Sequence, residues 1–152
     1  MFNKSPENLW IAVFNVPQGL TMSLAVSLFI GNADFVTVCR TFVCAYFVGV
    51  SLTLFLRIPV IGDAAARLLR CRAPAAKYLV SAFVGGAVMG VFIGFFITLV
   101  MLGPVPGFFA AFFHTLLFSM AVSGISSCVW VMPVNLLVAH AYSKEDGGGK
   151  NP

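Results

Sequence analysis

The chain alternates between long apolar stretches and short polar breaks. Two of the breaks, residues 31–34 and 103–107, contain Gly or Pro and are typical of tight turns. A helix of about 20 apolar residues crosses the hydrocarbon core of a bilayer. The apolar stretches of that length are Leu9–Ile30, Phe35–Leu56, Tyr78–Leu102 and Phe108–Val131. The pattern therefore predicts an all-α integral membrane protein with four transmembrane helices, joined as two antiparallel hairpins.

The two predicted hairpins resemble each other in sequence. The matching segments are Phe35–Thr41 with Phe109–Thr115 and Ile58–Val60 with Met132–Val134 at one constant offset, and Gly19–Ser23 with Gly86–Gly90 at a slightly shorter one. We therefore predict a first repeat with a basic link in residues 1–72, a second repeat in residues 73–142, and a disordered tail in residues 143–152. Because each unit crosses the membrane twice, both copies insert with the same topology. They should form parallel repeats about a pseudo-twofold axis along the membrane normal.

Small residues recur at every fourth position of the predicted spans. This spacing places them on one face of each helix. Such faces let helix backbones approach closely in lipid, where no hydrophobic force drives helices together. We interpret the faces as helix-packing surfaces, with a narrow polar seam for a ligand or water as the alternative. The assigned packing residues are Gly19, Ser23, Ser27, Gly49, Gly86, Gly90, Gly94, Ser119 and Ser123.

Composition supports the membrane assignment, because 60% of the residues are hydrophobic and only 9% are charged, against about 25% charged in soluble domains. Of the nine Lys and Arg residues, all except Arg40 fall in the termini or between the second and third spans. The positive-inside rule places that side, with both termini, in the cytoplasm. The net charge of +4 thus indicates membrane orientation rather than a nucleic-acid partner.

The basic link is expected to form a short helix of its own. Residues 62–72 combine good helix formers with arginines that anionic lipids of the inner leaflet attract. The alternative is that this segment only extends the second span past Pro59.

Four polar residues within the predicted spans are the candidate ligand-binding residues. Arg40 and His114 occupy matching positions in the repeats, where they could bind an anion or a headgroup near the outer surface. The alternative is that Arg40 reaches the headgroups along its aliphatic stem and that His114 is a hydrogen-bonded residue of the core or of a helix interface. Asn15 and Gln18 flank Pro17, which lacks a backbone donor and should kink its helix. We expect both amides to bond freed carbonyls or a neighbouring helix, with substrate contact as the alternative.

The sequence offers no catalytic constellation. It contains no HExxH or GxSxG motif, and none of its four cysteines forms a CxxC pair. No Asp or Glu lies within a predicted span, so a proton-coupled exporter has no membrane carboxylate to use. We expect no enzyme, no catalytic residue, no metal site and no cofactor.

The repeated segments resemble a bacterial family of small two-helix membrane proteins known only as a domain of unknown function. That family has a Met/Ser-rich first helix, a short loop and a second helix that ends near a Pro. The segments that carry the resemblance are Gly19–Ser27 with Arg57–Pro59, and Val88–Gly90 with Trp130–Pro133. The second span lacks the Trp expected in its outer half. The resemblance implies a tandem copy in the bacterial inner membrane, with no assigned activity and no functional residue to carry over.

Two functional hypotheses follow. The first is a small transport or lipid-binding protein, acting as a homodimer, with its site in the seam between the repeats. The second is an accessory or assembly subunit that docks on a larger membrane protein. A resemblance to small multidrug-type efflux proteins built from transmembrane pairs ranks below both, because their membrane carboxylate and Trp-Asn signature are missing. A binder should contain a polar cavity between the repeats, whereas an accessory subunit should have a packed interior and an outward apolar groove.

Overall fold

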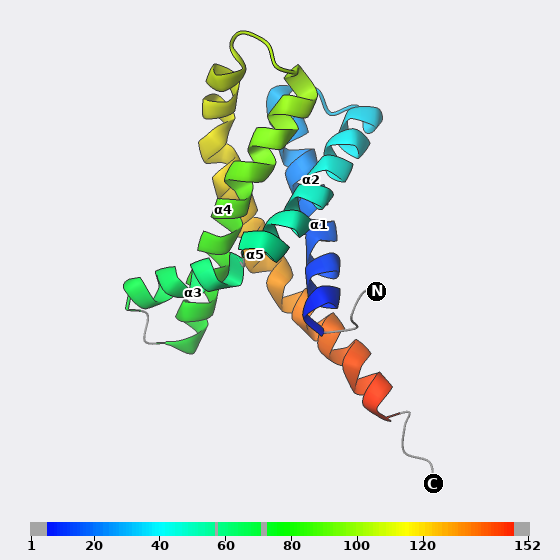
Figure 1. The fold of residues 1–152 in the computed structure, drawn as a ribbon, viewed down its shortest axis with the longest axis vertical. Coiled ribbons are helices and arrows are strands. Elements are labelled where there is room, and N and C mark those ends of the chain that lie inside the picture. Colours follow the sequence, from blue (N-terminus) through cyan, green and yellow to red (C-terminus); the bar gives the residue numbers. More distant parts are fainter. Residues whose placement is uncertain (1–5, 57, 71–72, 148–152) are drawn as a thin grey trace.

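The computed structural model describes residues 6–56, 58–70 and 73–147, which form five α-helices (Figure 1). The helices are α1 (Pro6–Ile30), α2 (Phe35–Leu56), α3 (Ile58–Leu68), α4 (Pro74–Leu102) and α5 (Phe108–Gly147). In this part of the chain, α1, α2, α4 and α5 are long and apolar enough to cross a membrane. The predicted all-helical fold with four candidate spans is confirmed, and the chain is a polytopic membrane protein.

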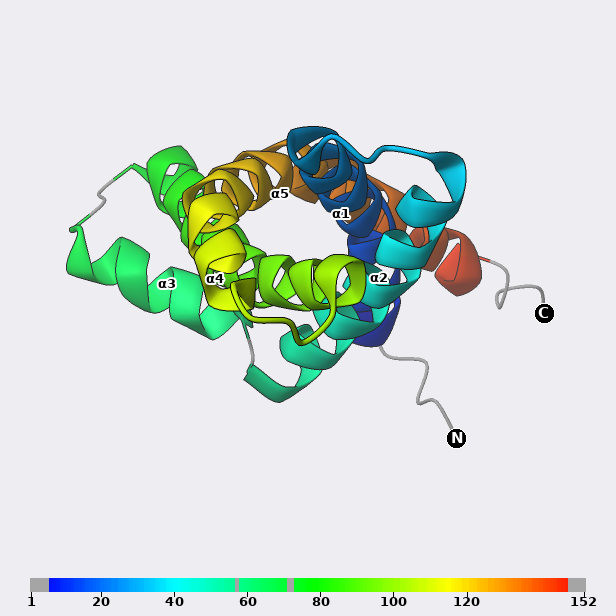
Figure 2. The same cartoon turned by 90° about the horizontal axis from the view of Figure 1, so that it is seen from above.

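The four long helices are arranged as two hairpins. α1 packs against α2, and α4 packs against α5. Between the hairpins, α1 contacts α5 and α2 contacts α4, while α3 lies outside the bundle against α4 (Figure 2). The two connecting turns lie at one end of the bundle, and α3, the start of α1 and the end of α5 lie at the other (Figure 1). Both turns fall where the sequence predicts them, and Gly31, Gly103 and Gly107 adopt positive φ angles there.

Asp34 caps α2. Its carboxylate accepts hydrogen bonds from the Thr37 amide at 2.9 Å and from the Thr37 hydroxyl at 2.6 Å. These two bonds from Thr37 lower the pKa of Asp34 below its usual 3.8, because they stabilise the ionised carboxylate. The cap thus supplies partners to groups that the first helical turn leaves unpaired.

The Asp34 cap should weaken in acid. A carboxylate whose pKa is lowered by folding stabilises the folded state above the unfolded pKa, and this contribution is lost as the pH falls through the lowered folded pKa. We therefore expect the protection of the Thr37 amide from hydrogen exchange to be constant above the usual pKa of 3.8 and to decline below it. An Asp34→Ala variant should show the low protection at every pH. Equal protection in both proteins near neutral pH would contradict the assignment.

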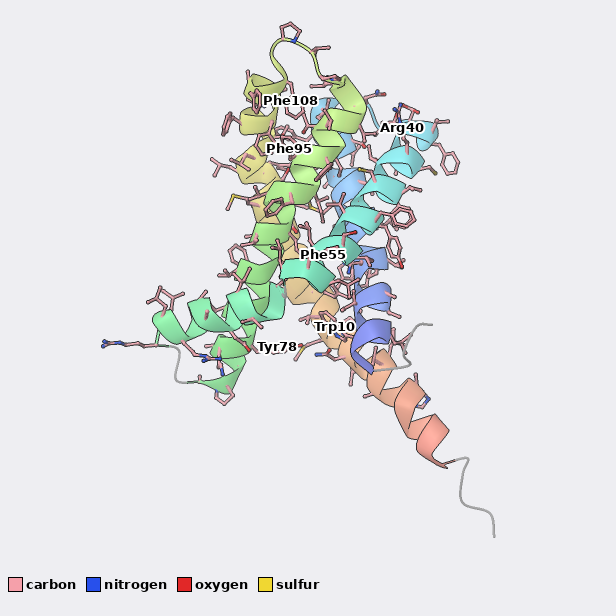
Figure 3. All side chains as sticks on the ribbon, viewed as in Figure 1. Trp10, Arg40, Phe55, Tyr78, Phe95 and Phe108 are labelled. Atoms are coloured by element: carbon pink, nitrogen blue, oxygen red, sulfur yellow. The ribbon has the colours of Figure 1, made fainter. Side chains whose placement is uncertain are left out.

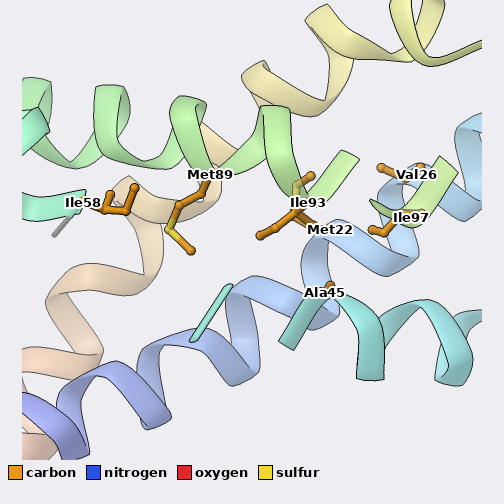
Figure 4. Packing of buried hydrophobic residues seen from close by; sticks show 7 residues of the cluster. All are labelled: Met22, Val26, Ala45, Ile58, Met89, Ile93 and Ile97. Carbon is orange, nitrogen blue, oxygen red and sulfur yellow. The ribbon is translucent and has the colours of Figure 1, made fainter. Parts of the chain in front are cut away.

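The buried apolar cluster joins both hairpins and α3. Its members come from α1, α2, α3 and α4 (Figure 4), and they are Met22, Val26, Ala45, Ile58, Met89, Ile93 and Ile97. A second cluster joins Phe14 of α1 to three valines of α5, namely Val131, Val134 and Val138. Helix α3 is therefore packed against the core through Ile58.

α4 and α5 approach each other closely at a row of glycines. A Cβ on Gly86 would lie 2.6 Å from the Ser123 carbonyl oxygen, and one on Gly90 would lie 2.6 Å from the Ser119 carbonyl oxygen. A Cβ on Gly94 would lie 2.8 Å from Ser119 Oγ. Since these distances are shorter than normal contacts, α5 occupies the space that a side chain would need.

Several helix boundaries differ from the predicted ones. α4 begins at Pro74, four residues before the predicted Tyr78, and α5 passes the predicted end at Val131. The link helix begins at Ile58, four residues before the predicted start at Gly62, because Ile58, Gly62 and Ala66 form a buried face on α3. α5 continues through Pro133 to Gly147, so residues 143–147 are helical where a disordered tail was predicted. A membrane helix tolerates the one donor that proline removes, and residues 144–146 (Lys-Glu-Asp) continue the helix. Residues 148–152 lie outside the described part of the chain.

Candidate functional site

A cleft of about 410 Å³ lies between the two hairpins at the α3 end of the bundle. All five helices contribute to its lining. Its wall is largely apolar, with Phe14 from α1, Ile58 from α3, Met89 from α4 and Val131 from α5. The volume falls within the range of small-molecule sites.

Three polar side chains form a bridge along one side of this cleft. The indole N–H of Trp10 donates to the Asn135 carbonyl oxygen, and the Asn135 amide donates to the Tyr78 hydroxyl. Trp10 also stacks on Phe14, with ring centroids 4.7 Å apart. The bridge links α1, α5 and α4, and Figure 3 shows Trp10 and Tyr78 at the same end of the bundle. Trp and Tyr at one level are typical of the membrane–water interface.

Asp63 is the carboxylate among the described lining residues. Its Oδ1 atom accepts a hydrogen bond of 3.0 Å from Ser81 Oγ. This pairing follows from the packing of α3, because Gly62 has no side chain and lies directly against the backbone and hydroxyl of Ser81. A half-buried carboxylate therefore borders an apolar cleft.

Ser127 contributes a hydroxyl without a partner. The residue is 2% exposed, lines the cleft, and its Oγ has no hydrogen-bond partner among the described residues. A buried hydroxyl without a partner costs about 1–3 kcal/mol. Ser127 is thus ready to donate to, or accept from, a group inside the cleft.

Asn15 and Gln18, two of the sequence candidates, lie in the helix interfaces. Gln18 is fully buried, and its amide donates to Ser123 Oγ at 2.8 Å and to the Ser123 carbonyl at 3.1 Å. Asn15 donates to the Ile11 carbonyl at 2.8 Å, and its own carbonyl oxygen lies against Gly49. The Gln18 amide therefore donates to the neighbouring helix α5, whereas the Asn15 amide donates to a backbone carbonyl of its own helix, α1.

Arg40 and His114, the other two candidates, are exposed and lie toward the end of the bundle that carries the turns. Figure 3 shows Arg40 near the start of α2. The His114 ring lies 5.7 Å from the Phe29 ring, centroid to centroid. Within the described part of the chain, neither residue lines the cleft, and neither do Asn15 and Gln18. The structure thus divides the four candidates between the helix interfaces and the opposite end of the protein.

The polar residues that line the cleft were missed in the sequence. Asp63 belongs to the basic link outside the spans, and Ser81, Ser127 and Asn135 are common polar residues whose spacing indicates no ligand site. One signal was present for Asp63, because the apolar and small residues at 58, 62 and 66 predict that this face of the link helix packs on the bundle. Asp63 then follows directly after a buried position.

Comparisons with known protein families, with curated proteins and with solved structures gave no match for this chain. The resemblance to two-helix membrane proteins therefore stays a prediction.

Proposed function

We propose that this protein binds a membrane-soluble amphipathic molecule, either a lipid or a small molecule, in the cleft between its hairpins. The proposal is supported by one observation: the cleft has an apolar wall and is also lined by several polar groups. One of these is the buried hydroxyl of Ser127, which has no hydrogen-bond partner among the described residues. Sites for small ligands combine these features. Transport of the same molecule between membrane leaflets is the activity that such a site would serve.

The hairpins are proposed to be repeated copies related by a pseudo-twofold axis along the membrane normal. Support comes from the sequence segments that the two hairpins share and from the reciprocal packing of α1 on α5 and α2 on α4. We also propose the bacterial inner membrane as the location, with both termini in the cytoplasm. Five of the nine Lys and Arg residues lie in residues 57–77, around α3, which the positive-inside rule assigns to the cytoplasm.

Filling the cleft should abolish binding. Ala82 lines the cleft from α4, so an Ala82→Phe side chain would occupy space that a ligand needs. We expect native mass spectrometry of the gently extracted wild-type protein to show one retained lipid or small molecule, and the Ala82→Phe variant to have lost it. Ala121→Phe is the matched control, since Ala121 is exposed on α5.

Equal retention by the two variants would place the bound molecule elsewhere and contradict the proposal. The absence of any bound molecule from all three proteins would also count against it, and would favour the accessory-subunit hypothesis. The mass of the complex reports in the same spectrum whether the protein is a homodimer.

A further inference from the structure

We propose that the ligand of the cleft is an aminophospholipid, a lipid whose headgroup carries both a primary ammonium and a phosphate. It would enter from the leaflet on the α3 side of the protein. This inference rests on the binding function proposed above and names the chemical class of the ligand.

The ammonium is assigned to Asp63. One carboxylate oxygen of Asp63 accepts the hydrogen bond from Ser81, and the described basic residues make no ion pair with it. The second oxygen therefore keeps its acceptor capacity, and Asp63 is among the residues that line the cleft. A primary ammonium carries three N–H donors and can form a charge-assisted hydrogen bond there. A trimethylammonium group has no N–H donor and cannot form that bond.

The phosphate is assigned to Arg67 and Lys77. Arg67 lies one turn after Asp63 on the same face of α3, and Lys77 lies one turn before Ser81 on the same face of α4. Both side chains are exposed. Two cations thus lie one turn away from the Asp63–Ser81 pair, on the two helices that hold it. A cationic amphipath without a phosphate would be repelled by them, whereas a headgroup with both charges complements the whole set.

The acyl portion is assigned to the apolar wall. Phe14, Met89 and Val131 line the cleft on the side of the core. The unpartnered Ser127 hydroxyl lies among them and can donate to an ester carbonyl of the lipid. Trp10 and Tyr78 line the same cleft and match the level of lipid headgroups. Asp63 and the apolar wall therefore line one cleft, and the two cations lie just outside that lining, so the groups that a phospholipid needs are close together.

The proposal can be tested with Trp10 as a reporter of lipid in the cleft. In a Trp130→Phe background, the only tryptophan is Trp10, because the chain has two. The protein is reconstituted in phosphatidylcholine vesicles that contain an equal, small fraction of brominated phosphatidylethanolamine or of brominated phosphatidylcholine. Bromine quenches indole fluorescence on contact. We expect the ethanolamine lipid to be favoured about three- to tenfold in apparent affinity over the choline lipid.

An Asp63→Asn variant should lose this preference, because asparagine keeps the shape and the bond to Ser81 but not the charge. Asp34→Asn is the matched control, since it removes a carboxylate at the other end of the bundle, and it should keep the preference. A combined Arg67→Gln and Lys77→Gln variant should weaken quenching by both lipids equally, because both lipids carry the phosphate.

Several results would overturn the proposal. Equal quenching by the two lipids, or a preference that persists in Asp63→Asn, would contradict the assignment of the ammonium. Unchanged quenching in the Arg67→Gln, Lys77→Gln variant would contradict the assignment of the phosphate. In these cases, quenching that Ala82→Phe abolishes would leave the binding function itself intact. Quenching that Ala82→Phe leaves unchanged for both lipids would contradict the inference and the proposed function together.

Discussion

Replacement of Gly90 by alanine is expected to lower the free energy of unfolding by about 1–3 kcal/mol, the usual cost of overpacking a tight interior. A Cβ at this position would lie 2.6 Å from the Ser119 carbonyl oxygen and 3.1 Å from the Met120 Cα. Both atoms belong to the backbone of α5, so no side-chain rotation can make room. α4 and α5 would have to move apart, and the neighbouring contacts of Gly86 and Gly94 would loosen with them.

Reversible unfolding in mixed detergent and dodecyl sulfate micelles, followed by circular dichroism, measures this loss. Gly19→Ala is the matched control. Its Cβ would be no closer than 3.4 Å to a neighbouring atom, the Tyr46 backbone nitrogen. This distance is an ordinary contact, so Gly19→Ala should change the unfolding free energy little. Similar losses in the two variants would contradict the tight α4–α5 interface.

Truncation of Ile93 to alanine is the second change with a large expected effect. Ile93 is fully buried in the apolar cluster that joins α1, α2, α3 and α4 (Figure 4). Removing three carbons leaves a cavity that the packed neighbours cannot fill. Such truncations cost about 2–5 kcal/mol in well-packed cores. We expect a loss of about 2 kcal/mol or more, since lipid cannot reach the cavity to replace the lost contacts.

Leu117→Ala is the control for this truncation, because Leu117 is 77% exposed on α5 and faces the surroundings of the bundle. Lipid tails can cover the shortened side chain there, so the same unfolding measurement should show a much smaller loss. A larger loss for Leu117→Ala than for Ile93→Ala would mean that the helices are rotated relative to this structure. It would also remove Met89, four residues before Ile93 on α4, from the cleft wall.

The candidate spans could be predicted from the sequence because bilayer thickness fixes their length. Apolar runs of about 20 residues stand out against a chain with few charges, and the turns at Gly31 and Gly103 are marked by residues that break helices. The end of α5 could not be predicted in the same way. Pro133 signals a stop in soluble proteins, but the backbone of a membrane helix continues through it to Gly147.

The cleft was harder to predict, because its residues come together only through tertiary packing. Asn135 belongs to α5 and bridges to Trp10 of α1 and Tyr78 of α4, which lie 125 and 57 residues away in the chain. No local sequence pattern predicts that these three side chains are in contact. Within the spans, ionisable side chains point to Arg40 and His114 as candidates, whereas the carboxylate at the cleft belongs to the short helix between the spans.

The docking of α3 explains how a chain without acidic residues in its spans still presents a carboxylate to an apolar cleft. Ile58, Gly62 and Ala66 hold α3 against α4 and the core, so Asp63 borders the cleft while Arg67 and Arg70 remain exposed. The protein thus keeps the Asp63 carboxylate outside the four hydrophobic spans. Burial of a charge inside a span would be the most costly.

Lipid binding in the cleft can be tested by a map of lipid contacts from photolabelling. Membranes that contain the protein would be loaded with a phospholipid bearing a photoreactive acyl chain, and the crosslinked residues would be identified by mass spectrometry. We expect labels concentrated on Phe14, Met89 and Val131, three cleft residues from both hairpins, and their loss in Ala82→Phe. Labels confined to lipid-facing residues such as Leu117 and Leu136, unchanged by Ala82→Phe, would contradict lipid binding in the cleft.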